Sequence, residues 1–180
     1  MELTTAEDVH VVCLFPTLET AMAFGETVEK YRVRVRNKPA IFGHQIVRDE
    51  CDEVAGEEES LLLNATEIDI PSALTLVNAH DGVCFPAHID RPSNGIVAVL
   101  GAFPADVPFT AFELHDKDAL LPHIDRFPHI RNLRHVVNSD AHYLWDMHEG
   151  DYTVELPVDD ADCSAQNVRD ALIRYLRGEG

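Results

Sequence analysis

The sequence predicts an α/β fold, in which short buried strands alternate with amphipathic helices. Apolar runs of strand length recur along the chain, and most of them stand next to a helix signal. Histidines and carboxylates follow several of these runs directly, at the ends of the expected strands. Ligands of α/β proteins bind at the carboxyl ends of strands, so this placement predicts where a functional site would lie.

The composition is that of one folded domain spanning residues 1–180. Hydrophobic residues make up 46% of the chain and charged residues 26%, which is ordinary for a domain with a sizeable core. The net charge of −18 would repel phosphate backbones, so we expect no binding to long duplex nucleic acid.

Membrane and export signals are absent from the sequence. No apolar run is long enough to cross a bilayer, which predicts no membrane partner, and the acidic first residues do not resemble a signal peptide. The four cysteines are widely spaced and form no CxxC pair. A reduced, cytoplasmic protein is therefore expected.

In the first half of the chain, residues 10–16 form a continuous apolar run that ends at a proline, as a buried strand would. Thr17 is expected to cap a helix that continues to about residue 31. Residues 31–60 are expected to be an insertion that contains a hairpin. Asp69 is a suitable cap for a helix over 70–80, and a strand over 83–87 follows Asp81-Gly82.

The second half repeats the alternation of strands and helices. We expect strands at 109–114, 135–137 and 152–156, a helical turn at 95–101, and helices at 116–126 and 164–177. Ser164 is the expected cap of the last helix.

Five side chains at expected strand ends could bind metal: Glu2, His10, His88, Asp140 and His142. Asp140 and His142 are two residues apart, so in an extended segment they point to the same side. Histidine and carboxylate together suit Zn, Mn or Fe. Each residue also has a structural interpretation: Asp-x-His is common by chance, and His88 alone is as compatible with a satisfied core histidine as with a ligand.

Three motifs in this order resemble the PHP (polymerase and histidinol phosphatase) superfamily. They are Glu2-Leu3-Thr4-Thr5 followed by His10-Val11-Val12, then Ala87-His88-Ile89-Asp90-Arg91-Pro92, then Asn138-Ser139-Asp140-Ala141-His142. The resemblance covers most of the chain. It implies a distorted (β/α)7 barrel that holds metal ions at the carboxyl ends of its strands and hydrolyses phosphoesters.

The resemblance also assigns roles to individual residues. Glu2 would be a bridging carboxylate, with His10 and His88 as its partners in one metal site. Asp140 and His142 would be ligands of the other sites. Arg91 would lie near the substrate phosphate, although a structural salt bridge is an equal alternative, and Asp90 would support the site or cap a helix.

The family's Asp-x-His-x-His and Thr-Asp-His motifs do not occur in these 180 residues. We therefore expect an N-terminally truncated barrel that could pair with a second copy through an exposed sheet edge. The expected function is metal-dependent hydrolysis of small phosphomonoesters or short oligonucleotides. The alternative is a non-catalytic PHP-like domain that binds metal or a partner protein.

Overall fold

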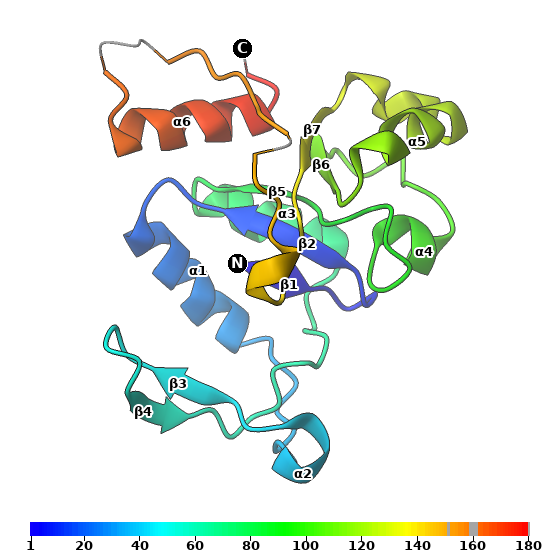
Figure 1. The fold of residues 1–180 in the computed structure, drawn as a ribbon. Helices are drawn as coiled ribbons and strands as arrows, with labels where there is room; N and C mark the ends of the chain where they lie inside the picture. The colour runs from blue at the N-terminus through cyan, green and yellow to red at the C-terminus, as the bar shows by residue number, and fades with distance from the viewer. Residues whose placement is uncertain (151, 159–161, 180) are drawn as a thin grey trace.

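The computed structural model describes residues 1–150, 152–158 and 162–179. Its central sheet contains β1 (Glu2–Thr4), β2 (His10–Leu14) and β5 (Val83–Pro86), in the order β1-β2-β5. Each neighbouring pair is antiparallel, so β1 and β5 run in the same direction on either side of β2 (Figure 1).

A second pair of strands lies beside this sheet. β6 (Ala111–Leu114) and β7 (Arg134–Val137) are parallel and paired in register. The end of β6 adjoins the chain that leaves β5, because the Ile89 N–H donates to the Glu113 carbonyl at 2.9 Å. The carboxyl ends of β5, β6 and β7 therefore meet, and the segments that carry His88, Asp140 and His142 emerge there.

Two groups of apolar side chains enclose the strands. The larger group packs α1 (Leu18–Glu29), α3 (Ile70–Ala79), α4 (Ile96–Leu100) and α5 (Leu120–Arg126) against the inner strands. The smaller group lies under α6 (Ala165–Leu176). Alternate residues of β2 serve the two groups: Val11 and Cys13 face the larger, and Val12 and Leu14 the smaller.

The expected helix caps are confirmed. The side chains of Thr17, Asp69 and Ser164 each accept a hydrogen bond from a backbone N–H in the first turn of the helix that follows. Short 3-10 helices at Lys117–Ala119 (η1), Pro128–Asn132 (η2) and Leu144–Asp146 (η3) complete the helical segments.

The expected hairpin is also confirmed. β3 (Ile46–Arg48) and β4 (Val54–Glu57) pair antiparallel with a bulge, and the short helix α2 (Pro39–Phe42) precedes them. This arm extends away from the sheets below α1 in Figure 1.

The prediction of a distorted (β/α)7 barrel is wrong. The described residues form one three-stranded and two two-stranded sheets, and no closed barrel is present among them. A β/α barrel needs parallel strands that are paired along both edges. Here β2 runs antiparallel to both of its neighbours, and among the described strands only β6 and β7 are a parallel hydrogen-bonded pair.

The strand expected at 152–156 is likewise not formed; the described segment 152–158 contains no strand. Its alternation of apolar and polar residues reflects packing, because Val154 contacts the apolar group under α6. Within the described part of the chain, no helix has the length and apolar character required to cross a membrane.

Candidate metal centre

The β1–β2 hairpin brings Glu2 and His10 to one face of the sheet. Thr4 pairs with His10, and Glu2 pairs with Val12 two residues further along β2. Side chains two apart on a strand share a face, so Glu2 and His10 are diagonal neighbours. His88 arrives from the other side of β2, two residues after the end of β5.

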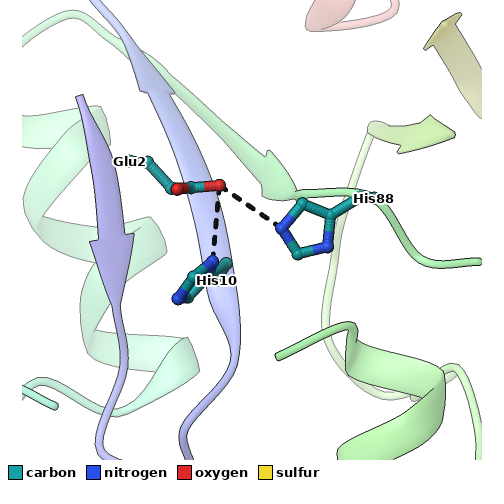
Figure 2. Close-up of side chains that lie close together, drawn as sticks. All are labelled: Glu2, His10 and His88. Carbon is teal, nitrogen blue, oxygen red and sulfur yellow. Dashed lines mark ion pairs between the residues drawn. The ribbon is translucent and has the colours of Figure 1, made fainter. Parts of the chain in front are cut away.

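The two imidazole rings approach the same carboxylate oxygen of Glu2. Oε1 of Glu2 lies 3.5 Å from Nδ1 of His10 and 3.4 Å from Nε2 of His88 (Figure 2). The two imidazole rings meet edge to face with centroids 5.4 Å apart. His88 is almost fully buried, whereas 44% of the Glu2 side chain is exposed, so the cluster is open to solvent on the carboxylate side.

This spacing fits a divalent metal ion. The candidate ligand atoms all lie within 4.8 Å of one another, and among the described residues this is the one group of three or more such side chains that does so. Donors bound at about 2.1 Å to a tetrahedral ion are themselves roughly 3.4 Å apart. In addition, Nδ1 of His10 is buried and has no hydrogen-bond partner among the described residues. A bound cation would satisfy that atom.

The electrostatics of the cluster couple its members. The neighbouring His10 and His88 side chains hold the pKa of the Glu2 carboxyl well below its usual range. Burial acts to lower the pKa of His88, but contact with Glu2 and the charges of Asp140 and Glu2 outweigh it, and the pKa is raised. Glu2 is therefore ionised and ready to bind a cation at neutral pH, whereas the raised pKa of His88 means that a proton competes more strongly with a metal ion for its ring nitrogen.

A second carboxylate, Glu113, supports the cluster and was missed in the sequence. It is buried on β6, where Oε1 accepts a hydrogen bond from the His88 N–H at 3.2 Å. Its Oε2 accepts another from Nδ2 of Asn138 at 2.6 Å. The sequence feature that could have revealed Glu113 is a single acid within the apolar run Phe109-Thr110-Ala111-Phe112-Glu113-Leu114. An acid in a buried strand has to be hydrogen-bonded by neighbouring groups, so its position there points to a structural or functional contact.

The other expected ligands do not join the cluster. The carboxylate of Asp140 is 3.6 Å from Nη2 of Arg91, so the salt-bridge alternative for Arg91 is the contact that is observed. His142 is exposed, and its Nδ1 lies 2.9 Å from the carbonyl of Asp140. Thus the structure brings together three of the five expected ligands.

Asp90, the residue expected to support the site or to cap a helix, contacts the backbone of another loop. Its two carboxylate oxygens accept hydrogen bonds from the backbone N–H groups of His115 and Asp116, each at 2.8 Å. These contacts join the loop after β5 to the loop after β6, next to the cluster.

The chain was compared with protein families, with curated proteins and with solved structures. No protein-family model and no curated protein matches this chain. Among solved structures it is similar to the novel lesion-specific endonuclease PfuEndoQ from Pyrococcus furiosus, with a TM-score of 0.57 and 17% sequence identity. The likeness covers 99% of this chain but 38% of that one. It is a likeness of fold alone, and this chain spans well under half of the endonuclease.

The same comparison overturns one expectation about partners. Long duplex nucleic acid was excluded on the net charge of −18, yet the chain shares its fold with a protein described as a lesion-specific endonuclease. The exclusion is wrong because net charge describes the whole surface. It does not fix the potential at a site where bound cations reverse the local sign.

Proposed function

We propose that this chain is a metal-dependent phosphoesterase or nuclease domain of the PHP kind. The observation that carries the proposal is the convergence of Glu2, His10 and His88 at distances suited to one divalent ion. The fold shared with an endonuclease supports the same class of reaction. The donor set is compatible with Zn, Mn or Fe.

Different residues are proposed to bind the metal ion and the substrate. Glu2, His10 and His88 would hold the ion, which when bound would act as a Lewis acid and lower the pKa of a bound water. Three protein ligands leave a position on the exposed side of Glu2 for water or a phosphate oxygen. We propose Arg91 as the group that contacts substrate phosphate, and Asp140 and His142 as ligands of further ions in the loaded protein.

The test measures metal and turnover together. The purified protein is stripped with EDTA, reloaded with Zn or Mn, and assayed for bound metal and for hydrolysis of a phosphomonoester and of an oligonucleotide. His88→Ala should lower metal affinity by more than the roughly 10–100-fold that loss of a supporting residue costs. His44→Ala is the control, because His44 is exposed on the hairpin arm and pairs with Glu57. Equal metal content and turnover in both variants would contradict the proposal.

A second candidate is a metal-binding module without catalysis. It is favoured by the contact between Asp140 and Arg91, which leaves three ligands in the cluster. This candidate predicts one ion per chain, metal-dependent stabilisation and no hydrolysis of either substrate. Turnover that is lost in His88→Ala would eliminate it.

A further inference from the structure

The turn that follows Asp140 and His142 presents large apolar side chains to solvent. It is built around η3, and its exposed side chains are Tyr143 (61%), Leu144 (84%), Trp145 (80%) and Met147 (58%). In Figure 1 this turn is the short amber helix drawn in front of β1 and β2. Contiguous exposed apolar side chains on a soluble domain mark interaction sites.

The two aromatic rings of the turn already stack on one another. The ring centroids of Tyr143 and Trp145 are 4.9 Å apart, and the ring planes differ by 4°. Such a parallel stack can be extended by another flat ring, and every nucleobase offers a π face of that kind. An aliphatic ligand would gain burial but no stacking.

The turn is held at both ends next to the candidate metal centre. At its start, Asp140 pairs with Arg91, which lies three residues after His88. At its end, the ring of His148 contacts the ring of His115 at 5.7 Å. Since Asp146 and Glu149 follow the aromatic pair closely in the sequence, an anionic group is disfavoured at the stack itself. The ligand should therefore place an uncharged ring there and its phosphate towards Arg91 and the cluster.

We infer that Tyr143 and Trp145 form a stacking platform for an unpaired nucleobase of a substrate whose phosphate binds at the centre of Glu2, His10 and His88. The inference rests on the proposed function, because it names the base-bearing part of the substrate. It distinguishes nucleotide substrates from phosphoesters that lack an aromatic ring.

Trp145 is the only tryptophan of the sequence, so intrinsic fluorescence reports directly on the platform. The full chain in EDTA, at about 0.15 M salt to screen its negative charge, is titrated with a short single-stranded adenine oligonucleotide. A backbone of the same length and charge without bases is the matched probe. The adenine oligonucleotide should quench Trp145 and bind about 5- to 150-fold more tightly than the abasic backbone.

Variants separate stacking from general apolar contact. Tyr143→Ala keeps Trp145 as the fluorescent reporter and should weaken oligonucleotide binding by about 5- to 150-fold. Leu144→Ala is the control, because Leu144 is more exposed than Trp145 in the same turn but has no π face. Its binding should change less than about threefold.

Two results would overturn the inference: equal binding of the abasic backbone, or a Tyr143→Ala variant that binds like the parent. A blue shift of Trp145 emission with rising protein concentration, without quenching by oligonucleotide, would instead assign the surface to contact between copies of the chain. The proposed function is tested separately by metal-dependent hydrolysis of glycerol phosphate and of the oligonucleotide. Hydrolysis of either substrate without quenching would reject the platform alone. Quenching without hydrolysis of either substrate would reject the proposed function, and with it the substrate-binding role of the platform, but would leave Tyr143 and Trp145 as a base-binding surface.

Discussion

Glu113 holds His88 by its backbone: Oε1 of the buried carboxylate accepts the His88 N–H at 3.2 Å. His88 needs such a contact because its φ of +27° is in the left-handed region, which is costly for a residue with a side chain. Asp140, with a φ of +49°, is connected to the same carboxylate through Asn138. One buried acid thus contacts both the segment that carries His88 and the segment that carries Asp140 and His142.

Replacing this acid should loosen the metal centre. Glu113→Gln keeps the shape but turns one of its two acceptors into a donor that faces another N–H group. We expect a loss of about 1–3 kcal/mol of unfolding free energy and a 10–100-fold loss of metal affinity. Chemical denaturation and zinc competition measure the two effects. Glu53→Gln, on the exposed hairpin arm, is the control, and an equal metal affinity in both variants would contradict the supporting role.

The loop that carries His88 is packed so closely that Gly95 admits no side chain. A Cβ at Gly95 would lie 2.6 Å from the Arg91 carbonyl oxygen and 2.9 Å from that of His88. We expect Gly95→Ala to cost about 1–3 kcal/mol of unfolding free energy, or roughly 2–12 °C in Tm, and to weaken metal binding. Gly56→Ala is the matched change, because a Cβ there meets nothing within 4 Å. A Tm for Gly95→Ala no lower than that of Gly56→Ala would contradict the prediction, because it would show that the loop can shift enough to admit a Cβ.

Replacing Arg91 can separate its two interpretations, a contact with substrate phosphate and a purely structural salt bridge to Asp140. The pair is partly exposed, so Arg91→Ala should change stability by less than about 1 kcal/mol. If Arg91 contacts phosphate, as proposed, kcat/KM should fall by about 10–150-fold, the equivalent of a charge-assisted hydrogen bond. Arg48→Ala removes a comparable pair with Asp52 far along the chain and should leave kcat/KM unchanged. Unchanged turnover in both variants would leave Arg91 a structural residue only.

The pKa shifts of Glu2 and His88 predict that stability depends differently on pH with and without metal. The pKa of Glu2 is lowered from 4.5, so its contribution to stability is complete above that pH and is lost on acidification. The pKa of His88 is raised from 6.5, so its contribution is complete below 6.5 and is lost as pH rises through the raised value. Metal-free protein should therefore be most stable between these two limits.

A divalent ion replaces the proton of His88, so metal-loaded protein should not lose stability on the alkaline side. Thermal unfolding against pH, in EDTA and with added metal, measures the difference. Glu2→Gln removes the charge that both shifts depend on and should flatten the metal-free profile. A parent profile in EDTA that coincides with that of Glu2→Gln would contradict the coupling.

Local features were predictable from the sequence because they depend on neighbouring residues. Thr17, Asp69 and Ser164 cap helices through N–H groups in the next turn, and the hairpin of β3 and β4 joins segments a few residues apart. The candidate ligands were identified from residue type and from position at strand ends. Their order along the chain also carried the family resemblance.

What the sequence by itself determined was therefore the α/β alternation, the caps and the identity of Glu2, His10 and His88 as candidates. Only the tertiary structure decided how the strands pair, and it replaced the expected barrel by small sheets with β2 antiparallel to both of its neighbours. It also decided that Asp140 faces Arg91 and that Glu113 supports His88. These outcomes depend on contacts between residues far apart in the chain, and periodicity along a sequence records which face a side chain occupies but not which partner it meets.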